Sequence, residues 1–168
     1  MERRREVRVL IAYRTRYGAT ASCTRRLSER LRAQAVVVDL AGPRPPSATE
    51  FDAVLIGGSI YGGKVQREVS SFCEREQRAL LARPVGLFLC CLLQGERAEA
   101  QLRSSFPDWL TAHAFQTAIF GGILEPRKLH LLDRLLVTSV APPRRIISRI
   151  DPEAIDRMAD ALNALIKT

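Results

Sequence analysis

An apolar run at residues 7–13, VRVLIAY, leads directly into the polar loop RTRYGAT at residues 14–20, after which a helical pattern begins. Such a run is typical of a strand that is buried on both faces of a parallel sheet. The first N–H groups of a helix lack backbone partners, and the helix dipole favours negative charge beside them. This strand, loop and helix therefore predict an anion site that is suited to a phosphate.

The glycine pattern of the loop narrows the choice of phosphate ligand. Gly18 is the only glycine in the turn, so the dinucleotide fingerprint G-x-G-x-x-G and the ATP loop G-K-[ST] are both absent. The pattern T-x-x-G-x-T at Thr15, Gly18 and Thr20 instead resembles the loop with which flavodoxin-like proteins hold the phosphate of FMN. The alternative is a threonine-capped turn that binds no ligand.

Length and composition predict one compact domain over residues 1–168, since 46% of the residues are hydrophobic. Neither a membrane-spanning run nor a signal peptide is recognisable, so a cytoplasmic protein is expected. The four cysteines follow no metal-ligand spacing and are expected to be small core residues. The adjacent Cys90 and Cys91 could be a redox-active pair. Strand geometry disfavours this, because it directs adjacent side chains to opposite faces of the sheet.

The net charge of +8 comes almost entirely from arginine. A basic chain suits an acidic protein, nucleic acid or an anionic membrane surface. The arginines are spread along the chain without interleaved aromatic residues or a nucleic-acid motif. We therefore expect no nucleic-acid partner and interpret most of the charge as solvated surface.

Apolar runs alternate with helical patterns along the whole chain. Strands are predicted at residues 7–13, 36–40, 53–57, 85–91 and 115–120, and helices at residues 21–35, 66–82, 96–113 and 152–166. The pair Phe106-Pro107 predicts a break in the third helix, and the proline-rich residues 41–50 predict an exposed connector without helix. This alternation indicates βαβ units, a parallel sheet and helices on both faces.

A five-stranded sheet in the order 2-1-3-4-5 would place the loops at residues 14–20 and 58–64 side by side, at its topological switch point. A phosphate on the first loop would then leave the rest of an FMN molecule beside the second. A response regulator shares this topology, but it needs acidic residues where this chain has Tyr13, Arg14 and Ser59. That alternative is excluded.

The segments LIAYRTRYGAT, FDAVLIGGSIYGGKV, ARPVGLFLCCL and FGGILEPRKLHLLDRLL together resemble the flavodoxin-domain family that includes the menaquinone-dependent protoporphyrinogen oxidases of bacteria. The resemblance spans almost the whole chain. The positions that agree with that family are Thr15, Arg16, Gly18, Thr20, Gly57, Ser59, Ile60, Gly63, Gly122, Leu124, Asp133 and Arg134. The positions that differ are Arg14, Tyr17, Tyr61, Gly62, Lys64 and Glu125, and they leave the substrate open.

The resemblance implies an α/β, flavodoxin-like three-layer sandwich with FMN as cofactor. The expected FMN-binding residues are Arg14, Thr15, Arg16, Tyr17, Gly18, Ala19, Thr20, Ser59, Ile60, Tyr61, Gly62, Gly63, Leu92, Leu93, Gln94, Gly95 and Gly122. Tyr61 is expected to lie against the flavin ring, and the neighbouring glycines are expected to let the backbone approach it. No catalytic residue and no metal ligand is assigned.

The implied function is an FMN-dependent oxidoreductase that passes electrons between a small-molecule substrate and a quinone or redox partner. Residues 92–95 contain no aromatic residue to cover the second face of the flavin, which favours an enzyme over a carrier. The alternatives are a flavodoxin-type electron carrier without a substrate of its own, and a fold that has lost its flavin.

Residues 127–141 form a predicted helix with a wide leucine-rich face and a basic flank. Such a face can rest on an anionic membrane, pack on the sheet, or pair with a second copy in a homodimer. The sequence leaves these three alternatives open.

Overall fold

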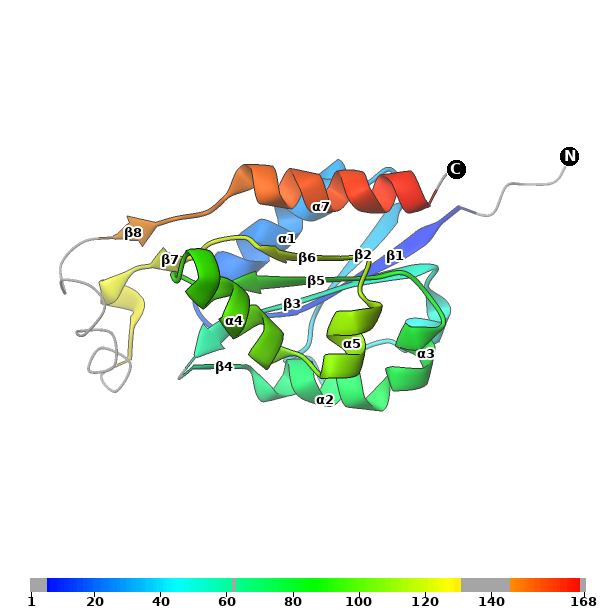
Figure 1. Ribbon diagram of the computed structural model, residues 1–168, viewed down its shortest axis with the longest axis horizontal. Helices are drawn as coiled ribbons and strands as arrows, with labels where there is room; N and C mark the ends of the chain where they lie inside the picture. The colour runs from blue at the N-terminus through cyan, green and yellow to red at the C-terminus, as the bar shows by residue number, and fades with distance from the viewer. Residues whose placement is uncertain (1–5, 62, 131–145, 167–168) are drawn as a thin grey trace, which may run out of the picture.

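The computed structural model describes residues 6–61, 63–130 and 146–166, apart from the side chain of Tyr61. Its main sheet contains five parallel strands in the order β2-β1-β3-β5-β6, and β4 pairs with the end of β3 in antiparallel fashion (Figure 1). The strands are β1 (Arg8–Arg14), β2 (Gln34–Asp39), β3 (Ala53–Tyr61), β4 (Lys64–Val65), β5 (Val85–Cys90) and β6 (Gln116–Ile119). Apart from β4, this is the predicted strand order.

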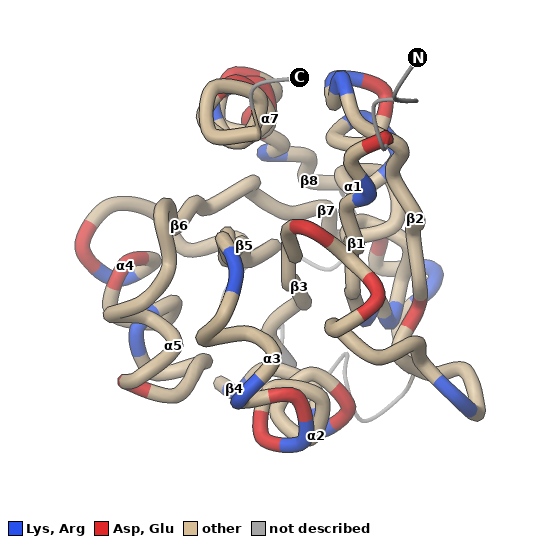
Figure 2. The backbone as a smooth tube through the Cα atoms, turned by 90° about the vertical axis from the view of Figure 1, so that its right-hand side faces the viewer, with Lys and Arg blue, Asp and Glu red and all other residues tan. Residues whose placement is uncertain are grey.

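Helices cover both faces of the sheet and make a three-layer α/β fold (Figures 1 and 2). One face carries α1 (Ala19–Arg30) and α7 (Pro152–Leu165). The other face carries α2 (Arg67–Arg75), α3 (Gln77–Leu81), α4 (Gly95–Ser105) and α5 (Asp108–His113). Two apolar clusters fill the spaces between the layers, with Cys90 in one and Cys91 in the other. All four cysteines are buried and free, as predicted.

Three of the predicted element boundaries were wrong. The first helix ends at Arg30 because Leu31 is extended, and Ala35 belongs to β2, where it pairs with Val9 of β1. The third strand continues through Ser59 to Tyr61, where a loop was expected, because β4 folds back onto it. The predicted helix at residues 66–82 is divided at Glu76 into α2 and α3.

The proline-rich connector is largely exposed, as predicted, but the expectation that it contains no helix was wrong. It ends in the 3₁₀ helix η1 (Ala48–Glu50), in which Ala48 is fully buried. Ser47 and Glu50 form a capping box around η1, in which the Glu50 carboxylate accepts from the Ser47 N–H at 3.3 Å. Glu76 then anchors the connector, accepting hydrogen bonds from the Ser47 hydroxyl at 2.8 Å and from the Ala48 N–H at 2.9 Å.

Replacing Glu76 with glutamine is expected to lower the free energy of unfolding by about 1–3 kcal/mol at pH 7, the cost of leaving buried donors poorly paired. Burial raises the pKa of Glu76, but the Ala48 N–H, Arg75 and Ser47 outweigh burial and hold that pKa below its usual value of 4.5. A lowered pKa stabilises the fold above pH 4.5, and this contribution disappears as the pH falls through the folded-state value. Urea denaturation should therefore show a gap between wild type and variant that narrows below pH 4.5.

Glu74 provides the matched control for this change, because it is exposed and lies two residues before Glu76, in the last turn of α2. Glu74→Gln should change stability little at any pH. A gap for Glu76→Gln that stays constant with pH would contradict the assigned role.

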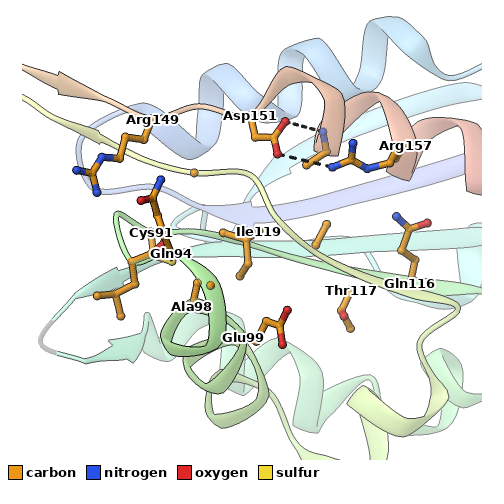
Figure 3. Close-up of a pocket in the computed structure, with 15 residues that line it drawn as sticks. Cys91, Gln94, Ala98, Glu99, Gln116, Thr117, Ile119, Arg149, Asp151 and Arg157 are labelled. Atoms are coloured by element: carbon orange, nitrogen blue, oxygen red, sulfur yellow. Dashed lines mark hydrogen bonds and ion pairs between the residues drawn. The ribbon is translucent and has the colours of Figure 1, made fainter.

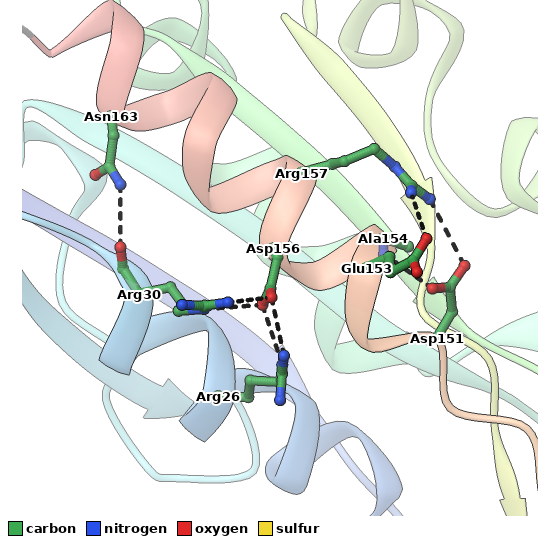
Figure 4. A network of polar contacts seen from close by, with 8 residues as sticks. All are labelled: Arg26, Arg30, Asp151, Glu153, Ala154, Asp156, Arg157 and Asn163. Carbon is green, nitrogen blue, oxygen red and sulfur yellow. Dashed lines mark hydrogen bonds and ion pairs between the residues drawn. The ribbon is translucent and has the colours of Figure 1, made fainter.

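Helices α1 and α7 are joined by a cluster of charged side chains (Figure 4). Asp156 of α7 accepts hydrogen bonds from Arg30 and from Arg26, the latter at 3.1 Å and 2.9 Å. These two arginines hold the pKa of Asp156 well below its ordinary value. Asn163 adds a bond to the Arg30 carbonyl, so the closing helix is fixed to the helix that begins at the predicted phosphate loop.

A two-stranded excursion that the sequence did not predict follows β6. It consists of β7 (Ile123–Leu124), paired in antiparallel fashion with β8 (Ile147–Ser148), and of the 3₁₀ helix η2 (Pro126–Lys128). The predicted leucine-rich helix at 127–141 does not begin as expected, because η2 ends at Lys128 and Leu129 is extended. Residues 131–141 of that prediction lie outside the described residues. Within the described ranges, no helix combines the length and apolar character needed to cross a bilayer.

Candidate functional site

The predicted phosphate loop joins β1 to α1 at the carboxyl edge of the sheet. Gly18 occupies the left-handed region with a φ of 92°, and its N–H donates to the Thr15 hydroxyl oxygen at 3.0 Å. The first turn of α1 contains no acidic residue and no side-chain cap. Since the N–H groups of Ala19, Thr20 and Ala21 have no partner within the helix, the loop presents donors to an anion.

Thr20 supplies the clearest test of whether this loop fits a phosphate. Its side chain is fully buried, and its hydroxyl oxygen has no hydrogen-bond partner. The neighbouring Cys90 thiol is only a weak hydrogen-bond partner for this hydroxyl. Thr20 lowers the pKa of Cys90, but Cys23 and burial raise that pKa overall. A buried unpaired hydroxyl costs about 1–3 kcal/mol, and a phosphate oxygen at the start of α1 would remove that cost. The donors of this loop therefore fit a phosphate group.

The two arginines of the loop have other partners. The Arg14 guanidinium lies between Asp39 at 3.6 Å and Glu68 at 3.3 Å, and it also donates to the Thr15 carbonyl. These two carboxylates compensate its charge, and its predicted contact with an FMN phosphate stays a prediction. Arg16 is exposed and lies 5.7 Å from the centre of the Tyr17 ring, to whose hydroxyl it also donates at 3.3 Å.

The second predicted loop is a hairpin built by glycines and by Gln66. A Cβ atom at Gly57 would lie 2.0 Å from the Phe88 ring, and one at Gly58 would lie 2.6 Å from Val65. Core packing therefore requires both glycines, and their predicted role in the approach of a flavin stays a prediction. Gln66 fixes the hairpin, since its side chain accepts from the Ser59 N–H at 3.1 Å and donates to the Ser59 hydroxyl.

The tip of this hairpin is more open. Gly63 has a φ of +77°, and no atom lies within 4 Å of the position that a Cβ atom would take there. The Gly63 carbonyl accepts from Gln101 of α4 at 2.7 Å. Ile60 is half-buried and packs against the apolar cluster beneath the hairpin. The Tyr61 side chain and Gly62 lie outside the described part of the chain, so the predicted contact of Tyr61 with the flavin is untested.

The third predicted loop, residues 92–95, leads from β5 into α4. Leu93 is half-buried, whereas Gln94 and Gly95 are exposed, and Gly95 has a φ of +57°. Arg149, which follows β8, donates to the Leu92 carbonyl at 3.2 Å. The backbone at Gly122 lies close to the start of the same loop, since a Cβ atom on Gly122 would lie 3.0 Å from the Cys91 carbonyl carbon. The predicted residues Leu92 and Gly122 are thus brought together.

A cavity of about 440 Å³ adjoins this loop, between α4, the edge strand β6 and the start of α7 (Figure 3). Cys91, Leu93, Ala98 and Ile119 contribute apolar surface. Its charged lining residues are Glu99, Arg149, Asp151 and Arg157. Arg157 is partly neutralised by Asp151, at 3.6 Å.

The three predicted loops follow β1, β3 and β5, which are adjacent in the sheet, so they lie along one edge. Sequence reasoning missed four residues that support them: Gln66, Gln101, Arg149 and His130. The His130 ring lies 6.3 Å from that of Tyr17, which brings the segment after β7 to the first loop. None of these contacts follows a local sequence pattern, since their partners are 7 to 113 residues away.

Solved structures confirm the fold. The chain is 14% identical to a Streptococcus pneumonia TIGR4 flavodoxin, with a TM-score of 0.57, and the match covers 95% of this chain and 100% of that one. A short-chain flavodoxin associated with a non-canonical PDU bacterial microcompartment is 13% identical, with a TM-score of 0.61 and coverages of 95% and 98%. The rubredoxin oxygen:oxidoreductase of Desulfovibrio gigas is 15% identical, with a TM-score of 0.51; 92% of this chain matches 36% of that enzyme.

No curated protein sequence matches the chain. A family profile, however, matches residues 10–144, which include all three loops, and its description is flavodoxin domain. The cofactor of this family is FMN, in agreement with the phosphate donors at the start of α1. By its sequence and its fold, the chain belongs to the flavodoxin-domain family.

Proposed function

We propose that the protein is an FMN-dependent oxidoreductase of the protoporphyrinogen-oxidase type, which passes electrons between a small-molecule substrate and a quinone or redox partner. Thr15, Gly18 and Thr20 would hold the FMN phosphate. The hairpin at residues 59–63 and the loop at residues 92–95 would lie on either side of the ring. When bound, FMN supplies hydride and single-electron transfer.

The observation that carries the proposal is the cavity beside the third loop. Its volume of about 440 Å³ is within the range of small-molecule sites, and Leu93, Gln94 and Gly95 belong both to its wall and to the predicted flavin contacts. Ala98 and Ile119 would exclude water from a bound substrate, while Arg149 holds the loop through the Leu92 carbonyl. A carrier that exchanges electrons only with proteins needs no such space.

The second candidate function is electron transfer without a substrate. It is supported by the likeness to two flavodoxins over nearly their whole lengths. The oxygen:oxidoreductase resembles this chain over only 36% of its own length, so its named activity is weaker support for an enzyme.

Narrowing the cavity separates the two functions. Ala98 is buried in the cavity wall, whereas Ala100 is exposed on the same helix. With reduced, FMN-loaded protein and the quinone menadione under anaerobic conditions, we expect saturable oxidation that Ala98→Leu slows about tenfold, a typical cost for overfilling a site. Ala100→Leu should leave the rate unchanged, and flavin absorbance checks that each variant is loaded.

Oxidation that rises linearly with menadione and is equal in all three proteins would contradict a substrate site. That result would favour the electron carrier.

A further inference from the structure

The carboxyl edge of the sheet carries cations that no carboxylate of the described chain neutralises. We define the basic rim as Arg44, Lys64, Arg67, Arg97, Arg127 and Arg149. All six side chains are exposed. Lys64 lies in β4, and the other five follow β2, β4, β5, β7 and β8. Arg149 donates to a backbone carbonyl, and none of the six takes part in an ion pair with a described residue.

The acidic residues at this edge, by contrast, are nearly all paired. Asp39 and Glu68 both face Arg14, and Glu125 pairs with Lys128 at 3.0 Å. Asp151 and Glu153 both face Arg157. Within the described ranges, Glu96 is the one acidic residue of this edge without a cation.

Helix dipoles add to the positive potential of the rim. Helices α1, α2, α4 and α7 all begin at the carboxyl edge, so their positive ends point the same way (Figure 1). At the opposite edge, exposed acidic residues such as Glu50 and Glu74 stand among Arg32 and Arg78. The described part of the carboxyl edge therefore carries more positive than negative charge.

The FMN phosphate cannot neutralise this rim. It brings about two negative charges, and it would be fixed at the β1–α1 loop, whereas the rim extends from the end of β2 to the segment after β8. Charges that surround a redox site without serving its ligand are typical of a surface that steers a partner of opposite charge.

We infer that the basic rim is the docking surface for an acidic electron-transfer protein, which exchanges electrons with the FMN of the proposed function. An anionic membrane is less well supported, because binding to a bilayer surface usually includes an apolar face. The large apolar side chains exposed in the described part of the chain are Val37, Leu81, Ile146 and Leu165, and of these only Ile146 lies at this edge.

The test uses an acidic [2Fe–2S] ferredoxin as the reductant of the FMN-loaded protein. Two reduced ferredoxins each give one electron, FMN takes both with two protons from water, and two oxidised ferredoxins leave. Between ionic strengths of about 20 mM and 300 mM, we expect the second-order rate constant to fall about tenfold or more. Calorimetry with the FMN-free protein should show ferredoxin binding that weakens over the same range.

Two matched variants distinguish an effect of the basic rim from an effect of the protein's net charge. Lys64→Glu with Arg127→Glu reverses two rim charges, whereas Arg32→Glu with Arg78→Glu makes the same total change at the opposite edge. At low ionic strength, the rim variant should lose about tenfold in rate and in ferredoxin affinity, and the control less than about threefold. Flavin absorbance and the rate of dithionite reduction show independently that FMN is bound and reducible.

Three outcomes would overturn the inference while leaving FMN binding intact: equal losses in both variants, a rate independent of ionic strength, or binding to phosphatidylserine vesicles without binding to ferredoxin. Absence of flavin absorbance would instead mark a failure of the proposed function. In that case, the binding measurement on FMN-free protein would still show whether the basic rim binds ferredoxin.

Discussion

Replacing Thr20 with valine is expected to weaken FMN binding by roughly 10- to 100-fold, the loss of one hydrogen bond to a charged group. The hydroxyl that valine removes is buried and has no partner in the protein beyond the weak one that the Cys90 thiol offers. The free energy of unfolding of the FMN-free protein should therefore stay the same or rise slightly, because an isosteric apolar group removes an unpaired oxygen. Fluorescence titration with FMN and urea denaturation measure the two effects separately.

Contact between this hydroxyl and a phosphate requires rotation about the Cα–Cβ bond, and threonine in a helix divides between two rotamers. Riboflavin, which lacks the phosphate, provides the ligand control, and Thr20→Val should not change its affinity. Equal losses for FMN and riboflavin would show that the substitution acts on the ring site or on the fold.

Thr24 provides the matched control residue. It lies one turn further along α1 and is equally buried, but its hydroxyl donates to the Ala21 carbonyl at 2.9 Å. Thr24→Val should therefore lower stability by about 1 kcal/mol, the value of an ordinary hydrogen bond. It should leave FMN affinity unchanged. Thr20→Val should therefore change affinity without lowering stability, and Thr24→Val should lower stability without changing affinity.

Replacing Gly121 with alanine should lower the free energy of unfolding by about 2–4 kcal/mol, the sum of left-handed strain and overpacking. Gly121 has a φ of +76°, and a Cβ atom there would lie 1.6 Å from the Arg149 carbonyl oxygen. The atoms that it would meet belong to the backbone, so no side-chain rotation relieves the clash. Because Arg149 also donates to the Leu92 carbonyl, the strain should spread to the third loop.

Gly95 isolates the two components of that cost. It too is left-handed, with a φ of +57°, but no atom lies within 4 Å of the position a Cβ would take. Gly95→Ala should cost only the conformational part, about 1–2 kcal/mol. Urea denaturation that gives the same loss for both variants would contradict the close approach of Gly121 to Arg149.

The sheet order and the strand–loop–helix unit could be predicted because their signals are local. Apolar runs such as residues 85–91 are buried on both faces, and the alternation with helical patterns admits few topologies. The end of α1 was misplaced because Leu31 and Ala35 continue an apolar four-residue spacing. In the structure, both residues lie outside the helix and pack against the apolar cluster between the sheet and helices α1 and α7.

The details of the site depend on long-range contacts that leave no local signal. From the sequence alone, Gly57 and Gly58 read as glycines of a phosphate or flavin loop. The structure shows in addition that side chains at these positions would clash with Phe88 and Val65. Arg14 was assigned to a phosphate because it stands in the loop. Its actual partners, Asp39 and Glu68, lie 25 and 54 residues away. Such pairings become visible only once the sheet has brought β1, β2 and α2 together.

FMN titration of the flavin-free protein, followed by visible absorption and fluorescence, tests the central claim most directly. The account predicts saturable binding, the absorption bands of oxidised flavin, and tighter binding of FMN than of riboflavin, because the loop at the start of α1 holds the phosphate. Binding of neither compound, or equal affinity for both, would contradict the assignment of Thr15, Gly18 and Thr20 as an FMN phosphate site.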